Sequence, residues 1–397
     1  MRKILLADCD AYFVQVARLE DPDGAGREPL LLVGGSPSGR GVVTSASYEV
    51  RKYGVRSGMP MSQALRLCPK AKWVGVPRGA CARKHREIRA VLDRFAPVVE
   101  AASIDEFYLD LTGTETVYRN ASLADIAQRL RIAVLEETRI NISLGGGTAR
   151  LIAKLAVRKA KPAGVHVVEP GAEADFMVEL PLAAIPGIGP KFQERLRRFG
   201  LVTCADVLPL ERAALEGWFR PGTGAWLYDR VRGIDNTHVA TRESQKSISR
   251  DETFARDIND DDVLATELLQ LVTRAGHDLR SDRLRARTVT VRVRDHDFTT
   301  RQASKTLDSA VESDRAINAV AVRLLARLRQ NRRVSARLLG VSLSNLTASA
   351  GPPQLGLFTA ETEPLESERD RKVAQVMDNV RARFGNKSIL PGRILPR

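Results

Sequence analysis

Acidic residues stand at two places where predicted strands end. Asp8 and Asp10 follow the apolar run at residues 3–7, and Asp105 and Glu106 lie in a tight turn within the apolar segment 98–111. If these strands are neighbours in one sheet, the carboxylates converge at its edge, where like charges are tolerable only with bound cations. Carboxylate oxygens suit Mg²⁺, and paired ions stabilise the attacking and leaving oxygens in phosphoryl chemistry. Taken alone, Asp8 and Asp10 are better explained as an ordinary strand end, and the turn at Asp105 and Glu106 is explained equally well as a surface turn.

The elements that must position these acids belong to a mixed domain. Short strands are expected at 3–7, 30–34 and 41–44 and within 98–111, and helical spacing occurs at 61–67, at 80–95 and over about 17 residues from Leu123. This mixture predicts an α+β domain that ends near residue 168. Residues 169–235 show short helices broken by Pro and Gly, and the polar residues 236–245 fit a linker.

Residues 246–346 form a third predicted unit with the order β-α-β-β-α-β, which is that of a split βαβ sheet with helices on one face. Within it, Val289, Val291 and Val293 alternate with Thr288, Thr290, Arg292 and Arg294. Such alternation predicts one buried and one exposed face. The exposed face could lie along a phosphate backbone, although an ordinary solvated face is the better explanation of this pattern taken alone. A loose stretch follows from 347, and then a charged helix near 364–384.

The composition indicates a folded, basic protein. The formal net charge of +14 favours a polyanionic partner, and 43% hydrophobic residues are enough for real cores. The four cysteines show no CxxC spacing, so neither a zinc site nor a disulfide framework is indicated and a cytoplasmic location is expected. No apolar run approaches the length of a membrane span.

Three blocks carry a family resemblance: residues 2–13 (RKILLADCDAYF), 41–60 (GVVTSASYEVRKYGVRSGMP) and 103–113 (SIDEFYLDLTG). Together they resemble Y-family DNA polymerases, and most closely the bacterial DNA polymerase IV (DinB) branch. The resemblance implies a multidomain right-hand polymerase with a ferredoxin-like palm, small fingers, a helical thumb and a split βαβ little finger. The implied bounds are palm 1–168 with fingers at about 17–75, thumb 169–235 with a helix-hairpin-helix at about 183–200, linker 236–245, little finger 246–346 and tail 347–397.

The resemblance also assigns the site. Asp8, Asp105 and Glu106 would be the catalytic carboxylates that hold two Mg²⁺ ions, and Cys9 would offer its backbone carbonyl to one ion. Phe13 would be the steric gate that leaves no room for a ribose 2′-hydroxyl. The implied nucleotide contacts are Tyr12, Phe13, Tyr48, Arg51 and Lys161. Because Tyr48 and Arg51 are three residues apart, a helical turn would place them on one face.

The same resemblance also implies residues that contact DNA and a motif that binds a sliding clamp. Ile185–Lys191 resembles a helix-hairpin-helix, in which Gly187, Gly189 and Lys191 would contact a phosphate, and Arg292 and Arg294 would contact DNA from the little finger. Gln354, Leu355, Leu357 and Phe358 belong to a pentapeptide that resembles a sliding-clamp motif. Taken alone, a glycine turn and a five-residue motif are common without any ligand.

The implied function is low-fidelity translesion synthesis: template-directed addition of a deoxynucleotide to a primer, without proofreading, by a monomer that binds primer-template DNA, dNTP and a sliding clamp. One alternative is a catalytically inactive polymerase-like adaptor bound to the clamp, and another is a nucleotide cyclase. Two positions depart from the family pattern. Ala149-Arg150 stands where Asn-Lys is usual, and Ala17-Arg18 stands where a glutamate is common.

Overall fold

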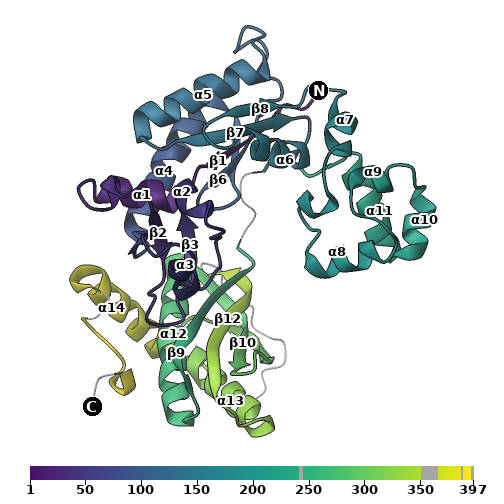
Figure 1. The fold of residues 1–397 in the computed structure, drawn as a ribbon. Coiled ribbons are helices and arrows are strands. Elements are labelled where there is room, and N and C mark those ends of the chain that lie inside the picture. Colours follow the sequence, from purple (N-terminus) through teal and green to yellow (C-terminus); the bar gives the residue numbers. More distant parts are fainter. Residues whose placement is uncertain (241–244, 350–364, 386–387, 395–397) are drawn as a thin grey trace. The chain divides into compact units, whose positions relative to one another are not determined.

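The computed structural model describes residues 1–240, 245–349, 365–385 and 388–394. The chain divides into two compact units, Met1–Glu243 and Ser244–Arg397, and each unit is described by itself below (Figure 1). In the described part of the chain, no helix is long and apolar enough to cross a membrane.

A five-stranded sheet forms the centre of the first unit, with the order β5-β6-β1-β7-β8. The strands are β1 (Ile4–Cys9), β5 (Val98–Ala101), β6 (Glu106–Asp110), β7 (Ile142–Gly147) and β8 (Val165–Val167). The apolar run of β1 is buried along its whole length because the strand is central and both of its faces are covered. The sheet therefore places the acid-bearing ends of β1 and β6 next to each other.

Helices cover the two faces of this sheet differently. Helices α4 (Arg78–Phe95) and α5 (Leu123–Thr138) pack on the face that carries Leu5 and Ala7. Helix α6 (Arg150–Ala160) packs on the opposite face, which carries Ile4 and Leu6. There β7 contributes Gly145, where a Cβ atom would lie 2.2 Å from both the Ala153 carbonyl oxygen and the Val157 nitrogen. Helix α6 thus lies directly on the backbone of β7, with no side chain between them.

The segment between β1 and α4 forms a small α/β layer of its own. It contains α1 (Tyr12–Glu20), η1 (Ala25–Arg27), β2 (Leu31–Gly34), β3 (Val43–Ala46), α2 (Tyr48–Arg51), α3 (Met61–Leu67) and β4 (Lys72–Val74). The three strands pair in the order β3-β2-β4. Ser47 caps α2 by accepting a hydrogen bond from the Val50 nitrogen, which starts this short helix at Tyr48.

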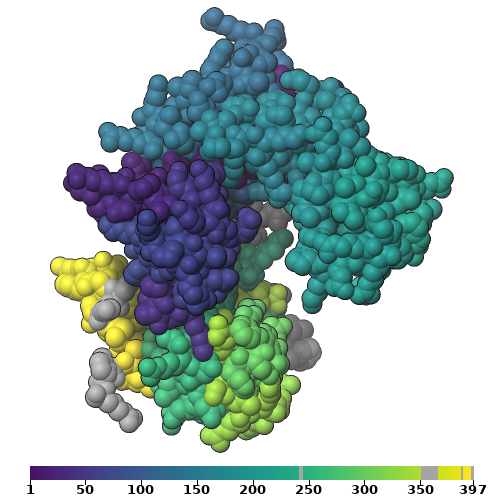
Figure 2. Space-filling model, in the orientation of Figure 1, coloured from purple at the N-terminus to yellow at the C-terminus, as the bar shows by residue number. Residues whose placement is uncertain are grey.

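The rest of the first unit is helical, as the Pro and Gly pattern predicts. It comprises α7 (Glu173–Val178), η2 (Leu182–Ala184), α8 (Pro190–Arg197), α9 (Cys204–Val207), α10 (Arg212–Trp218) and α11 (Pro221–Val231). The space-filling view shows the part around α8–α11 as a distinct teal lobe of this unit (Figure 2). The core of the helical part continues into α6 through Ile152 and Leu155.

Part of the predicted polar linker packs against the first unit. Asp235, the residue just before this linker, accepts a hydrogen bond from the Leu151 nitrogen at 3.1 Å, and Val239 within it is buried beside Ile4 and Leu6. Ala240 donates its backbone N–H to Glu100 at 3.0 Å. The chain is therefore held on the first unit as far as Ala240.

The second unit confirms the predicted order β-α-β-β-α-β. Its elements are β9 (Ser247–Ile258), α12 (Asp261–Ser281), β10 (Leu284–Asp295), β11 (Thr300–Val311), α13 (Asp314–Asn331) and β12 (Ala336–Ala348). The antiparallel sheet has the order β11-β10-β12-β9. Val289, Val291 and Val293 are fully buried with residues of α12 and α13, as the alternation predicts.

A last helix, α14 (Glu368–Phe384), is attached to the second unit through ion pairs, and η3 (Gly392–Ile394) follows it. Asp378 accepts from Arg280 at 2.7 Å, and Asp370 accepts two hydrogen bonds from Arg315 at 2.9 Å each. Glu366, just before the helix, is buried and accepts from the backbone nitrogens of Glu312 and Ser313. These contacts join α14 to the segments around α12 and α13.

Candidate active site

Asp8 and Glu106 lie directly opposite each other on neighbouring strands. They are register partners of β1 and β6, and residues opposite each other on one face of an antiparallel pair have their Cβ atoms about 5 Å apart. Both are placed on the α6 face of the sheet, because β1 alternates Leu5 and Ala7 on one face with Ile4 and Leu6 on the other. Two of the predicted catalytic carboxylates are thus brought together.

Each of these two carboxylates is paired with a lysine. The Lys161 ammonium lies 2.6 Å from Asp8 Oδ1, and the Lys154 ammonium contacts Glu106. Lys154 lies on α6 and Lys161 is the residue that ends this helix, so the helix and its C-cap supply both cations. Burial raises the pKa of Asp8 to about 6 even though Lys161 opposes this shift, and the Glu106 charge adds to the rise.

Asp105 completes the group of acids but directs its side chain elsewhere. Its carbonyl oxygen accepts from the Cys9 nitrogen at 2.9 Å, which links the turn to β1. Its carboxylate accepts from the Ser103 hydroxyl at 2.5 Å. The Cys9 thiol is fully enclosed, and burial followed by the charges of Asp105, Asp8 and Asp10 raises its pKa well above the usual range. The Cys9 thiol therefore keeps its proton.

The charges at this site fit divalent cations, although the side chains are not arranged as a ligand set. Within the described residues, no group of three or more His, Cys, Asp or Glu side chains is placed to hold a metal ion. Asp8 and Glu106 instead receive positive charge from Lys161 and Lys154. Buried carboxylates need such compensation, and their oxygen atoms are the ligands that hard divalent cations prefer.

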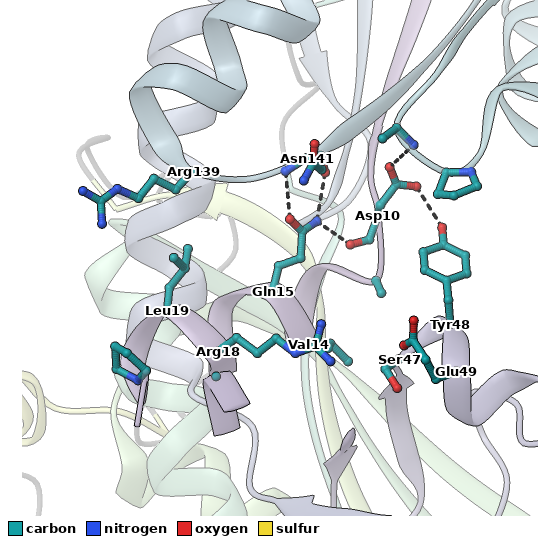
Figure 3. Close-up of a pocket in the computed structure, with 15 residues that line it drawn as sticks. Asp10, Val14, Gln15, Arg18, Leu19, Ser47, Tyr48, Glu49, Arg139 and Asn141 are labelled. Carbon is teal, nitrogen blue, oxygen red and sulfur yellow. Dashed lines mark hydrogen bonds between the residues drawn. The ribbon is translucent and has the colours of Figure 1, made fainter. Parts of the chain in front are cut away.

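Asp10 is buried next to this group, with only 4% of its surface exposed. Its carboxylate accepts hydrogen bonds from the Tyr48 hydroxyl at 2.9 Å, from the Ser143 hydroxyl at 2.9 and 3.0 Å, and from the Ala163 nitrogen at 2.8 Å. Figure 3 shows the Asp10 carboxylate between the Tyr48 side chain and the main chain after α6. Burial and the neighbouring Asp10 charge hold the pKa of Tyr48 well above its ordinary value, so this hydroxyl keeps its proton.

A cavity of about 530 Å³ lies beside Asp10 and Tyr48. Its lining includes Gln15, Arg18 and Asn141 (Figure 3). Gln15 is fixed there, because it donates to the Asn141 carbonyl oxygen at 2.9 Å and accepts from the Asn141 nitrogen at 2.8 Å. Neither Asp8 nor Glu106 lines the cavity, which therefore adjoins the carboxylates without enclosing them.

Four of the five predicted nucleotide contacts occupy the start of α1 and the short helix α2, and the fifth, Lys161, follows α6. The half-buried Phe13 ring meets Tyr12 edge-on, with ring centres 5.5 Å apart. Tyr12 points into the core, where its hydroxyl donates to the Cys81 carbonyl oxygen at 2.6 Å. The Arg51 guanidinium lies 4.8 Å from the centre of the Tyr48 ring, which confirms that these two residues share one face of a helical turn.

The two positions that depart from the family pattern have structural partners. Arg150 pairs with both carboxylate oxygens of Glu100, at 2.5 and 2.9 Å, and stacks 4.1 Å from the Tyr108 ring centre. Arg18 donates to the carbonyl oxygens of Glu28 at 2.7 Å and Pro29 at 3.3 Å. Both arginines therefore act within the fold of the first unit.

Among the predicted DNA contacts, Gly187, Gly189 and Lys191 are exposed, whereas Arg292 and Arg294 are partly buried. Gly187 has a positive φ of 100° in the turn between η2 and α8, whereas Gly189 has an ordinary φ of −79° at the N-cap of α8. Lys191 is exposed in the first turn of α8. In the second unit, Arg292 lies 3.6 Å from Asp251, and Arg294 donates to the Thr300 hydroxyl. The clamp-like pentapeptide 354–358 lies outside the described residues.

Lys154 and the contacts of Asp10 with Ser143 and Ala163 are site features that the sequence pattern did not reveal. Lys154 is seven residues before Lys161, which corresponds to two turns of one helix and places both on the same face. That spacing is a usable signal, but only once residues 150–160 are known to be helical. The residues that bind Asp10 are 38 to 153 residues away in the chain, and no local pattern joins them.

Family profiles match three segments of the chain. The impB/mucB/samB family matches residues 7–158, and its C-terminal domain matches residues 245–357. The thumb domain of DNA polymerase-iota matches residues 183–235. The three matches follow one another along the chain without overlap.

Curated relatives match over most of the chain. A DNA polymerase IV from Dehalococcoides mccartyi (strain CBDB1) is 33% identical over 99% of this chain and 97% of that protein. A DNA polymerase IV from Methanoculleus marisnigri is 40% identical over 87% of this chain and 94% of that protein.

Solved structures agree with these relatives. The Y-family DNA polymerase chimera Dbh-Dpo4(243-245)-Dbh superposes with a TM-score of 0.79 at 27% identity, over 87% of this chain and 99% of that one. The insertion ternary complex of Dbh DNA polymerase gives a TM-score of 0.60 at 26% identity over the same shares. The chain therefore belongs to the Y family of DNA polymerases, and it is a DNA-directed DNA polymerase of the translesion kind.

Proposed function

We propose that this polymerase adds deoxynucleotides to a primer 3′-hydroxyl with two Mg²⁺ ions, at low fidelity and without proofreading. Y-family polymerases are metal-dependent, and they act on primer-template DNA and dNTP. The observation that carries the proposal is the cross-strand pair Asp8–Glu106, with Asp105 in the adjoining turn. Asp8, Asp105, Glu106 and the Cys9 carbonyl would hold the ions, which supply charge neutralisation at the transferred phosphorus when bound.

The protein's own contribution is positioning. The Phe13 ring would lie under the sugar and exclude a 2′-hydroxyl. Arg51 would bind triphosphate oxygens through its planar fork, with Tyr48 beside it and Lys161 on the opposite side. Their placement supports this assignment, because Arg51 stacks on Tyr48 and Lys161 lies beside Asp8. In nucleotidyl transfer, most of the rate enhancement comes from holding the reacting groups in line and from neutralising their charge.

Primer extension tests the proposal directly. Wild-type protein with Mg²⁺ should extend a primer, whereas Asp105→Ala should reduce the rate by at least about 100-fold, as removal of a transition-state contact commonly does. Asp110→Ala is a matched control, because Asp110 is an acid of the same region at the opposite end of β6. If the wild type binds DNA but never extends a primer, the protein is an adaptor. If it instead makes cyclic nucleotides, it is a cyclase.

DNA binding through the thumb hairpin and the second-unit sheet belongs to the same proposal. The hairpin would present backbone N–H groups around Gly187 and Gly189 to a phosphate, and Arg292 and Arg294 would contact the backbone of the duplex. We expect Arg292→Ala to weaken binding uniformly across sequences and to reduce the salt slope by about 1. A change that depends on sequence would contradict a contact with phosphate.

Docking on a sliding clamp through Gln354, Leu355, Leu357 and Phe358 is proposed from the sequence motif. Replacing Leu357 and Phe358 with alanine should abolish binding of the purified chain to a bacterial clamp and leave clamp-free primer extension intact. We further propose that the chain acts as a monomer in the cytoplasm. The four cysteines are free and buried, which is compatible with a reducing compartment.

A further inference from the structure

The buried carboxylate of Asp10 joins three segments that are distant in sequence. Its hydrogen-bond donors come from α2 (the Tyr48 hydroxyl), from β7 (the Ser143 hydroxyl) and from the turn after α6 (the Ala163 nitrogen). All three donors are neutral. A buried carboxylate without such donors would be costly, so the three segments and the carboxylate stabilise one another's positions.

Two of these three segments carry proposed triphosphate contacts. Tyr48 has a single hydroxyl hydrogen, which is directed at Asp10, and its ring supports the Arg51 guanidinium. Ala163 is two residues after Lys161, so its hydrogen bond to Asp10 anchors the turn that carries this lysine. The third segment, at Ser143, carries no proposed nucleotide contact.

From this geometry we infer that Asp10 is a positioning residue for the incoming nucleotide, which sets the distance between the Tyr48–Arg51 side and the Lys161 side of the triphosphate site. This inference rests on the proposed roles of Tyr48, Arg51 and Lys161. It goes beyond them because it assigns the spacing of these side chains to an acid that need not touch the nucleotide or a metal ion.

The test uses single-nucleotide insertion by the full-length protein, with KM for dNTP and kcat measured separately. Asp10→Asn keeps the shape of the side chain but replaces one acceptor oxygen with a donor. We expect its KM to rise about tenfold, which corresponds to the loss of one hydrogen bond to a charged group, while kcat falls less than threefold. Ser143→Ala is the matched control, because it removes a donor to the same carboxylate on the side away from the nucleotide. Its KM should change less than threefold.

A double-mutant cycle with Tyr48→Phe separates positioning from general stability. If Asp10 acts through Tyr48, the double variant should have nearly the same KM as the worse single variant, because both changes break one link. Additive effects of Asp10→Asn and Tyr48→Phe on KM would overturn the inference. So would equal KM values for Asp10→Asn and Ser143→Ala.

Thermal unfolding of every variant completes the test. If Asp10→Asn does not fold, Tyr48→Phe alone still decides, since an unchanged KM in that variant would show that the link does not bear on the nucleotide. Failure of the inference is distinct from failure of the proposed reaction, because it leaves primer extension and its sensitivity to Asp105→Ala intact.

Discussion

Asp8 and Glu106 face each other across β1 and β6, and α6 with the turn after it brings a lysine to each of them. Two carboxylates in one place repel each other, and the two ammonium groups balance that repulsion. A divalent cation that binds here must therefore displace or share these lysine contacts.

Lys154→Met should strengthen metal binding, because it removes a positive charge that competes for Glu106. We expect the dissociation constant for Mn²⁺, measured by paramagnetic titration without substrate, to fall about two- to fivefold, as befits a partly exposed ion pair. Lys159→Met is the control, since Lys159 lies on the same helix but pairs with Glu179. Weaker Mn²⁺ binding in Lys154→Met would show that the lysine assists the site.

Phe13→Ala should relax the choice of sugar. Removing the half-buried ring opens space at the start of α1, so ribonucleotide insertion should rise by about 100-fold or more relative to deoxynucleotide insertion, the equivalent of a few kcal/mol of steric exclusion. Insertion of dNTP by the same variant is the internal control. An unchanged ratio of the two kcat/KM values would remove Phe13 from its proposed role.

The Arg150–Glu100 pair should matter for stability. The Arg150 side chain is 17% exposed and holds Glu100 with both arms of its guanidinium. Arg150→Lys keeps the charge but loses the fork, and should lower the free energy of unfolding by about 1–2 kcal/mol. Arg158→Lys, at an exposed position of the same helix, should leave it within about 0.5 kcal/mol. If Arg150→Lys and Arg158→Lys lower the free energy of unfolding equally in denaturant titrations, the two-armed contact of Arg150 with Glu100 has no specific role.

The two hairpin glycines should respond differently to alanine. At Gly187 the φ of 100° and a Cβ position 2.9 Å from Trp226 Cζ2 both oppose a side chain. At Gly189 an added Cβ atom would have no such neighbour within 4 Å. Gly187→Ala should therefore cost at least about 1–2 kcal/mol in unfolding free energy, and Gly189→Ala should be near neutral. A larger loss of unfolding free energy for Gly189→Ala than for Gly187→Ala would contradict the described turn.

Attachment of α14 should depend on pH. Hydrogen bonds from the Ser367 backbone and hydroxyl, together with Arg315, lower the pKa of Asp370 to about 2. Because this value lies below the unfolded value of about 3.9, ionised Asp370 stabilises the fold above about pH 4, and that contribution is lost as the pH falls toward 2. The difference in Tm between wild type and Asp370→Asn should shrink over this interval. If this Tm difference stays constant as the pH falls, the pH dependence of stability comes from a group other than Asp370.

Sequence patterns predict the elements whose burial is regular. The apolar run of β1 and the alternation at Val289–Val293 are confirmed, because burial follows strand geometry directly. Strand β7 and helix α6 are not among the predicted elements. Three glycines in β7 argue against a strand. The strand forms nevertheless, because it pairs with β1 along its whole length and its bare backbone at Gly145 lets α6 pack directly on it.

The candidate site likewise has a part that the sequence predicts and a part that it does not. The neighbouring positions of Asp8 and Glu106 follow from two strand ends, and the structure brings them together. The enclosure of Asp10 depends on Ser143 and Ala163, which reach it only through tertiary folding. Long-range hydrogen bonds to a buried acid leave no periodic trace in the chain, so the sequence alone could not reveal them.

Gly145 has a consequence for how this enzyme could change during evolution. Since α6 lies directly on the backbone at this residue, any side chain there would act as a spacer and lift the helix from the sheet. Lys154 and Lys161 would move away from Asp8 and Glu106 together, although neither lysine had mutated. The absence of a side chain at position 145 thus maintains the alignment of charges among the proposed catalytic residues. We therefore expect selection on catalysis to conserve this glycine, although it is not proposed to contact substrate.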